Sequence, residues 1–151
     1  MAYIIGIDGG GTKTSFCLLN TAENRKHYLK TGETNFKNIG IEKTKENMEA
    51  GLQEILKQEK LEIKDIDCFV LGAAGCDTEK DYKIFKEILK DIGIKDRVFI
   101  YNDAKVAFKA CSGKDGIIII SGTGSISFSY NQNRENRLGG WGAEISDIGS
   151  G

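Results

Sequence analysis

Residues 5–16 read IGIDGGGTKTSF and carry the strongest structural signal in the chain. The short β-rich run Tyr3–Asp8 leads into a cluster of glycines, after which Thr14–Leu19 continues with Phe16 and Leu18 on one face. Period-two alternation on both sides of a glycine cluster is typical of a β-hairpin. The segment therefore predicts a strand, a glycine turn and a second strand.

The glycine turn fits neither of two common phosphate-binding motifs. A P-loop requires G-x-x-x-x-G-K-[ST], but here Thr12 stands between Gly11 and Lys13. A dinucleotide fingerprint opens a helix, whereas Thr14 opens a segment with strand periodicity. A glycine-rich hairpin can still bind phosphate, because backbone N–H groups without neighbouring side chains form an anion-binding concavity. We interpret the turn as a candidate phosphate loop made of Gly9, Gly10, Gly11, Thr12 and Lys13, although a single turn of this kind is more often purely structural.

Asp8 ends the first expected strand. A carboxylate repels phosphate, but it suits hydrated Mg²⁺, which keeps several waters and needs only one or two carboxylates. Asp8 is therefore the candidate metal ligand.

The rest of the first half alternates helices and strands. Amphipathic spacing predicts helices over Ile41–Gln58 and from Thr78-x-x-Asp81, a capping-box pattern, to Gly93. Strands are expected at His27–Thr31, Asp67–Leu71 and Arg97–Tyr101, and a small-residue helix follows Asn102-Asp103. The fold class is α/β, with a first domain at residues 1–113.

The opening pattern then recurs. Gly116–Ser121, a turn at Gly122, Thr123 and Gly124, and Ser125–Tyr130 repeat strand, turn and strand, with a third strand near Arg137–Leu138. Residues 114–151 are therefore expected to begin a second copy of the domain. Two such hairpins can hold one triphosphate from opposite sides, which favours a phosphoryl-transfer site.

Composition limits the possible partners. Apolar residues make up 40% of 151 residues and the net charge is −1, so we expect a globular protein that binds neither nucleic acid nor membrane. The N-terminus has no basic n-region, which predicts a cytoplasmic protein. The four cysteines form no C-x-x-C pair and His27 is the only histidine, so we interpret the thiols as incidental; an iron–sulfur cluster shared between subunits is the alternative.

Several motifs together resemble one family. IGIDGGGTKTSF (5–16), TNFKNIG (34–40), GAAGCD (72–77), YNDAKVAF (101–108), ISGTGSIS (120–127) and GGWGAEISDIGSG (139–151) are similar, in order, to the N-terminal half of the BadF/BadG/BcrA/BcrD ATPases. That family belongs to the actin/Hsp70/hexokinase-like superfamily, and the likeness is greatest to its N-acetylglucosamine kinases. The resemblance implies a duplicated ribonuclease H-like fold with a mixed sheet flanked by helices and ATP between the copies.

The resemblance also implies roles for single residues. It places Asp8 on the magnesium side and Gly11, Thr12 and Thr123 on the phosphates. It makes Asp103 the general base toward a sugar hydroxyl and assigns sugar contacts to Asn35, Gly140, Trp141, Gly142 and Asp147. From the residues alone, Asp103 follows a parallel strand at the edge where such sheets bind ligands, and helix capping is an equally good explanation. Phe36-Lys37 and Leu138 depart from the family pattern, so the sugar stays open.

The leading expectation is an ATP- and Mg²⁺-dependent amino-sugar kinase. The alternative is an activator ATPase of the 2-hydroxyacyl-CoA dehydratase or benzoyl-CoA reductase type, but this chain has G-G-W-G near the second loop and no cysteine beyond Cys111. A nucleotide- or sugar-sensing module is a third possibility. Because the chain holds one domain and only the first strands of another, we expect it to be inactive alone. The strands Ile117–Tyr130 would leave an unpaired apolar edge, so we also expect a homodimer or strand exchange, which a strictly monomeric chain would contradict.

Overall fold

The computed structural model describes residues 2–112, 115–121, 125–131 and 134–140. The chain divides into two compact units, Met1–Asp103 and Ala104–Gly151.

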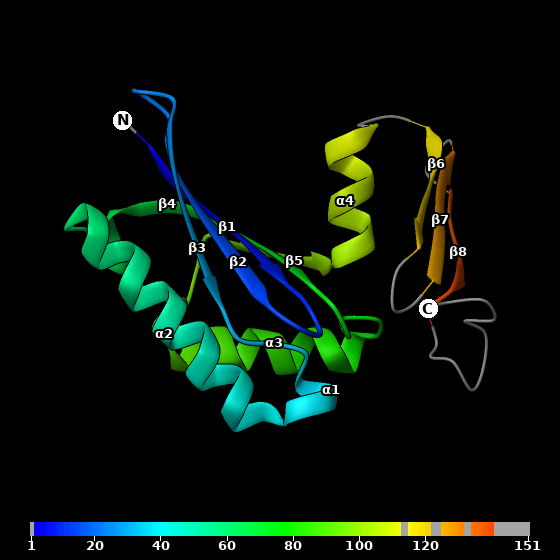
Figure 1. Ribbon diagram of the computed structural model, residues 1–151, viewed down its shortest axis with the longest axis horizontal. Coiled ribbons are helices and arrows are strands. Elements are labelled where there is room, and N and C mark those ends of the chain that lie inside the picture. The colour runs from blue at the N-terminus through cyan, green and yellow to red at the C-terminus, as the bar shows by residue number, and fades with distance from the viewer. Residues whose placement is uncertain (1, 113–114, 122–124, 132–133, 141–151) are drawn as a thin grey trace. The chain divides into compact units, whose positions relative to one another are not determined.

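The first unit is built on a five-stranded mixed sheet in the order β3-β2-β1-β4-β5 (Figure 1). Its strands are β1 (Tyr3–Gly9), β2 (Thr14–Asn20), β3 (Arg25–Thr31), β4 (Ile66–Ala73) and β5 (Val98–Asn102). The first three strands form an antiparallel meander, whereas β1, β4 and β5 run parallel. The predicted hairpin and the mixed sheet are confirmed.

Helices cover one face of this sheet. The unit contains α1 (Phe36–Ile39), α2 (Ile41–Glu59), the 3₁₀ turn η1 (Ile63–Asp65) and α3 (Glu79–Asp91). Alternate strand residues such as Ile5, Ile7 and Phe16 point toward α2 and α3 and are buried with Met48 and Phe85. Figure 1 shows α2 and α3 on the same side of the sheet. Burial of this apolar layer is the main stabilising term of the unit.

Parallel pairing brings three strand ends together. Gly9 of β1 is in register with Ala73 of β4, and Ala73 is in register with Asn102 of β5. The loops that follow β1, β4 and β5 therefore leave the sheet at the same edge, which is where open α/β sheets bind ligands.

The second unit contains most of α4 (Asp103–Cys111) and a three-stranded antiparallel sheet of β6 (Gly116–Ser121), β7 (Ser125–Asn131) and β8 (Arg134–Gly139). Phe108 of α4 packs against Phe128 and Tyr130 of β7, with ring centroids 5.7 and 6.1 Å apart. This packing places α4 with the second unit, whereas the expected domain boundary lies after this helix. That boundary stays a prediction.

Two short elements were not expected from the sequence. Both α1 and η1 are single turns, too short to show a helical period. Among the described helices, none combines the length and the hydropathy that a membrane crossing requires.

Candidate active site at the carboxyl edge of the first sheet

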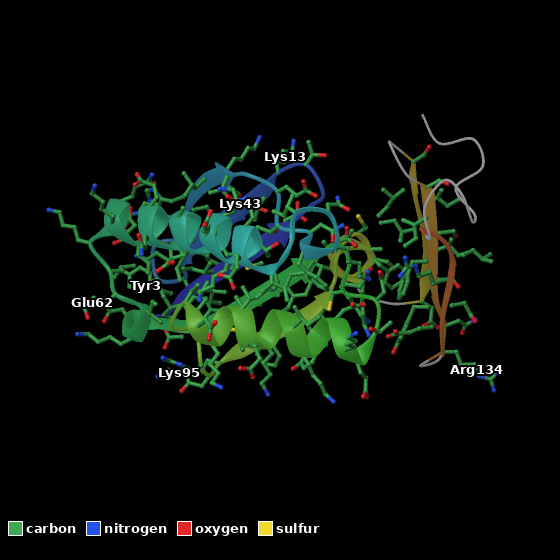
Figure 2. All side chains as sticks on the ribbon, turned by 90° about the horizontal axis from the view of Figure 1, so that it is seen from below. Tyr3, Lys13, Lys43, Glu62, Lys95 and Arg134 are labelled. Atoms are coloured by element: carbon green, nitrogen blue, oxygen red, sulfur yellow. The ribbon has the colours of Figure 1, made fainter. Side chains whose placement is uncertain are left out.

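The candidate phosphate loop is a tight turn at the tip of the β1–β2 hairpin. The Gly10 amide donates a hydrogen bond to the Lys13 carbonyl at 3.1 Å, and a Cβ added at Gly10 would lie 2.7 Å from that oxygen, so the turn requires glycine. Gly11, Thr12 and Lys13 are exposed, and Figure 2 shows Lys13 at the far end of the hairpin from Tyr3. Within the described residues, no hydrogen-bond acceptor is assigned to the amides of Gly11 and Thr12. An exposed turn with available amides can bind an anion.

Backbone hydrogen bonds fix this turn to two other loops. The Gly10 carbonyl accepts from the Thr34 amide at 3.1 Å, and the Gly9 carbonyl accepts from the Ala74 amide at 2.7 Å. The hydroxyls of Thr14 and Thr34 lie 2.7 Å apart, and both residues are fully buried. A buried hydroxyl pair holds its geometry because breaking it would leave polar groups without partners. The turn is therefore anchored to the β3–α1 loop and to the β4–α3 loop.

Asn35 belongs to the β3–α1 loop and lies beside Gly11 of the turn and Gly75 of the β4–α3 loop. It caps the N-terminus of α1, with its Oδ1 accepting from the Lys37 amide at 3.1 Å. A Cβ added at Gly75, whose φ is +83°, would meet Asn35 Oδ1 at 2.5 Å, and one added at Gly11 would lie 4.0 Å from Asn35 Nδ2. The predicted sugar residue and the predicted phosphate loop are thus immediate neighbours in the fold.

Two carboxylates stand at the ends of nearby strands. Asp8 is exposed near the end of β1, on the sheet face opposite Ile7, and is in register with Gly72 of β4. Asp103 follows Asn102, the last residue of β5, and is the first residue of α4. Because β4 separates the two strands, β1 and β5 run about 10 Å apart.

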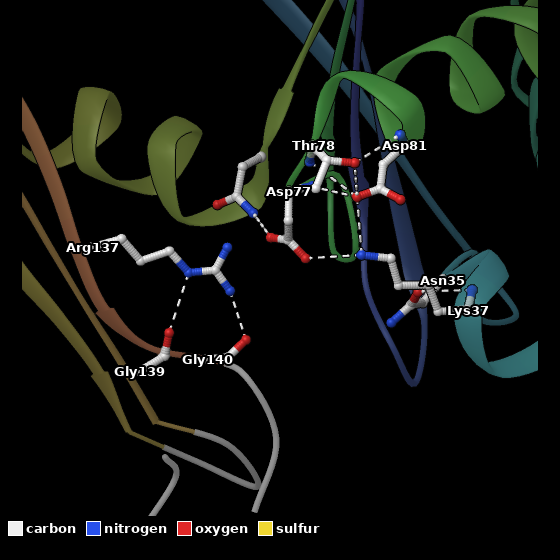
Figure 3. A network of polar contacts seen from close by, with 9 residues as sticks. Asn35, Lys37, Asp77, Thr78, Asp81, Arg137, Gly139 and Gly140 are labelled. Atoms are coloured by element: carbon white, nitrogen blue, oxygen red, sulfur yellow. Dashed lines mark hydrogen bonds and ion pairs between the residues drawn. The ribbon is translucent and has the colours of Figure 1, made fainter. Parts of the chain in front are cut away.

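A polar network beside Asn35 was not expected from the sequence. Lys37 Nζ lies 3.0 Å from Asp77 Oδ2 and 3.0 Å from Asp81 Oδ2 (Figure 3). Asp77 Oδ1 accepts a hydrogen bond from Asn102 Nδ2 at 3.0 Å. The network joins α1, the β4–α3 loop and the end of β5. Asp77 and Asp81 follow the GAAGC segment (72–76) in the sequence, but no local sequence pattern connects them with Lys37.

Burial and ion pairing shift the pKa values of Asp81 and Lys37 in opposite directions. Burial raises the pKa of Asp81, but the hydrogen bonds from Lys37, from the Thr78 hydroxyl and from the Asp77 amide outweigh it, so the pKa lies below its ordinary value of 3.8. Burial lowers the pKa of Lys37, but the hydrogen bonds to Asp81 and Asp77 raise it overall above 10.5. The ion pair is therefore fully charged across the neutral pH range.

The depressed pKa of Asp81 predicts an acid-sensitive contribution to stability. This contribution is present above the unfolded-state pKa near 3.8 and disappears as the pH falls through the lower folded-state pKa. The contribution of Lys37 has the opposite sign and is lost only as the pH rises beyond 10.5. We expect Asp81→Asn to lower the melting temperature at pH 7 and to flatten its decline between about pH 5 and pH 2.

Asp91→Asn is the matched control for that experiment, because Asp91 is an exposed carboxylate paired with Lys45 at 3.1 Å. Melting followed by circular dichroism across the pH series measures both variants. Parallel pH profiles for Asp81→Asn and the unmodified protein would contradict the assignment.

The cysteine next to this network, Cys76, is not expected to react as a thiolate. Cys76 is buried beside Asp77, and burial raises its pKa to about 11, so its thiol stays protonated at neutral pH. In the described ranges no three His, Cys, Asp or Glu side chains gather as a metal cluster. A hydrated Mg²⁺ needs no such cluster, because one or two carboxylates suffice.

In the second unit, the structure describes the predicted sugar-binding segment as far as Gly140. Arg137 donates from Nε to the Gly139 carbonyl at 3.2 Å and from a terminal nitrogen to the Gly140 carbonyl at 2.6 Å (Figure 3). The Gly140 amide donates to the Ser125 carbonyl at 2.8 Å. Positive φ values of +77° and +70° at Gly139 and Gly140 explain why glycine stands at both positions. The predicted residues Gly122, Thr123, Gly124, Trp141, Gly142 and Asp147 lie outside the described residues.

Comparison with known proteins places the chain in a family. The sequence profile of the BadF/BadG/BcrA/BcrD ATPase family matches residues 5–151. An N-acetylmuramic acid/N-acetylglucosamine kinase from Clostridium acetobutylicum is 33% identical over 153 aligned positions, which cover 100% of this chain and 50% of that protein. An N-acetyl-D-glucosamine kinase from Dictyostelium discoideum is 34% identical and is matched over 97% of this chain and 50% of its own length. The chain thus spans about half the length of the curated relatives it matches.

Solved structures show the same relationship. A proposed N-acetylglucosamine kinase from Chromobacterium violaceum superposes with a TM-score of 0.78 at 25% identity, covering 99% of this chain and 53% of that one. A second proposed N-acetylglucosamine kinase, from Porphyromonas gingivalis, also gives 0.78 at 24% identity, over 99% of this chain and 52% of its own. The predicted fold class is confirmed, and the chain belongs to the BadF/BadG/BcrA/BcrD ATPase family.

Proposed function

We propose that this chain forms the N-terminal part of an ATP-dependent kinase that phosphorylates a hydroxyl of an amino sugar, N-acetylglucosamine or glucosamine. One observation carries the proposal: Asn35 lies beside both Gly11 of the phosphate turn and Gly75. Asp103 follows β5 at the same edge of the sheet. A phosphate donor and a sugar acceptor bound at these loops would be neighbours, which is the main requirement of phosphoryl transfer. The names of the relatives support this choice of substrate.

The phosphate side is assigned to the first hairpin. In this proposal, Gly9–Lys13 binds the ATP phosphates through backbone amides, the Thr12 hydroxyl and the Lys13 ammonium. A phosphate-binding role is also proposed for Gly122, Thr123 and Gly124. Asp8 fits Mg²⁺, because it is an exposed carboxylate at the strand end beside that turn. Bound Mg²⁺ would neutralise charge on the phosphates.

The sugar side is assigned to Asn35 and to the loop that begins at Gly140. Asn35 offers an amide for sugar hydroxyls, and Gly140, Gly142, Trp141 and Asp147 supply the remaining contacts. Asp103 accepts the proton of the attacking hydroxyl, because a carboxylate at this position can act as general base while the bond to phosphorus forms.

The decisive experiment is ADP release by the full-length protein with Mg-ATP and a panel of hexoses and amino sugars. Release that depends on an amino sugar, and that is lost on Asp103→Asn, supports the kinase. Sugar-independent turnover by a brown, iron-containing protein would instead identify an activator ATPase. Sugar or nucleotide binding without any turnover would identify a sensing module.

The phosphate-loop assignment makes a separate prediction. Thr12→Val keeps the side-chain volume but removes the hydroxyl, so we expect the KM for ATP to rise about fivefold to tenfold while the KM for sugar changes less than about twofold. Thr21→Val is the control, because Thr21 follows the end of β2 that is remote from the turn and its hydroxyl bonds the Ala2 backbone. Equal weakening of both substrates would contradict the assignment.

The proposal extends to assembly and location. Ile117 and Ile119 on one face of the edge strand β6 are 71% and 74% exposed, and we propose that a second copy covers this strand in a homodimer. We also propose a cytoplasmic location, where ATP is available, and no nucleic-acid or membrane partner.

A further inference from the structure

We propose that Lys37 and Asp77 are positioning residues that hold the Asn35 loop against the end of β5 and thereby set the spacing between Asn35 and Asp103. The inference rests on the proposed kinase function, because it concerns how the sugar residue and the base are kept in place. Neither side chain was expected from the sequence to take part.

Lys37 is connected to the turn that orients Asn35. Its backbone amide donates to Asn35 Oδ1 at 3.1 Å, and its ammonium group reaches Asp77 and Asp81, each at 3.0 Å. The same residue therefore supports the Asn35 side chain and fastens α1 to the β4–α3 loop. Because α1 has only four residues, it has little stability of its own and depends on such contacts.

Asp77 connects Lys37 to the end of β5. One of its oxygens faces Lys37 (Figure 3). The other accepts a hydrogen bond from Asn102 Nδ2 at 3.0 Å. Its side chain is only 13% exposed, so water competes weakly for either contact. Asn102 precedes Asp103, so a shift of the Asp77 carboxylate would be transmitted to the residue next to the base.

The start of α3 does not require Lys37. Thr78 and Asp81 form a reciprocal capping box, and Asp81 also accepts from the Asp77 and Thr78 amides at 3.1 and 3.0 Å. Phe36 of α1 packs edge-on against Phe85 of α3, with centroids 5.2 Å apart. The capping box and the Phe36–Phe85 contact do not involve the Lys37 ammonium group. Its removal should therefore disturb the orientation of the Asn35 loop more than the folding of the unit.

Removing the cation would nevertheless leave two carboxylates facing each other. Asp77 and Asp81 both point at Lys37 Nζ, and without it their like charges repel. Asp81 is held by the capping box, so we expect the Asp77 carboxylate to move more than that of Asp81 when the ammonium group is removed. The expected consequence is a misplaced Asn102–Asp103 segment and a loosened Asn35 loop.

The test compares Lys37→Met with Lys37→Arg in the full-length protein. We expect Lys37→Met to raise the KM for sugar and to lower kcat, each about tenfold, with the KM for ATP within about twofold. Lys37→Arg should recover most of the activity, because a guanidinium can also bridge two carboxylates. Lys45→Met, which removes a surface pair with Asp91 at 3.1 Å, is the matched control and should behave as the unmodified protein.

A second readout does not depend on activity. In ¹H–¹⁵N spectra, the side-chain amide signals of Asn35 and Asn102 should move in Lys37→Met and stay in place in Lys45→Met. Melting temperatures identify any variant that fails to fold, and Lys37→Gln then replaces Lys37→Met.

The outcomes separate the two proposals. If the unmodified protein shows no sugar-dependent ADP release, the proposed function fails, whatever the variants do. If it is active but Lys37→Met matches Lys45→Met in the KM for sugar, in kcat and in the two amide signals, the positioning role is overturned. Equal rises in the KM for sugar and for ATP would also overturn it, because they would indicate a general loss of structure.

Discussion

Asp103→Asn is expected to lower kcat for sugar phosphorylation by about a thousandfold, within the range that general-base catalysis contributes. The substitution keeps the size and shape of the side chain but removes the group that accepts the hydroxyl proton. The KM for ATP should change little, because the phosphate loop lies on another strand. Steady-state kinetics of ADP release in the full-length protein measure both values.

The same substitution distinguishes catalysis from a role at the start of α4. Asparagine stabilises helix starts about as well as aspartate, so a purely structural Asp103 would tolerate the change with its turnover intact. Asp96→Asn is the matched control, because Asp96 is an exposed carboxylate just before β5, at the other end of the strand. Full activity in Asp103→Asn would remove the general base from the proposed mechanism.

Gly51→Val is expected to destabilise the first unit by about 3 kcal/mol, the upper end of the usual cost of overpacking a core. Gly51 lies in the buried face of α2, and a Cβ added there would overlap the ring of Phe16 on β2. Phe16 is fully buried and cannot move without displacing the core. The absence of a side chain at Gly51 therefore lets α2 approach the sheet.

The control for this variant is Gln53→Val, which introduces the same residue on the exposed face of the same helix. Gln53→Val should cost less than about 1 kcal/mol, because it removes an exposed hydrogen bond from Gln53 to Glu49 at 3.2 Å and lowers the helix propensity without meeting the core. Urea or thermal unfolding of both variants gives the comparison. Similar losses of unfolding free energy in Gly51→Val and Gln53→Val would show that the space at Gly51 is not needed for helix α2 to pack on the sheet.

Several elements could be predicted because their signals are local. The β1–β2 hairpin follows from period-two alternation around a glycine cluster, and the capping box follows from the three-residue spacing of Thr78 and Asp81. The location of Asp103 at the end of β5 also follows from its place in the chain. By contrast, α1 was missed because one helical turn has no period to recognise.

The candidate site shows where sequence reasoning ends. Asn35, Asp8 and the phosphate turn could be chosen by residue type and by family resemblance, but their adjacency could not. Thr14 and Thr34 are ordinary residues in the sequence, yet their buried hydroxyls lie 2.7 Å apart and couple the phosphate turn to the Asn35 loop.

The sequence by itself determined the hairpins, the amphipathic helices, the family and the chemical types of the candidate groups, because each depends on periodicity, turn chemistry or a contiguous motif. Only the tertiary structure decided that Lys37, Asp77 and Asn102 form one network, since these residues are brought together by parallel pairing of β4 with β5 and by the docking of α1. The physical reason is that hydrogen bonds and ion pairs act over about 3 Å, whatever the separation of the residues along the chain.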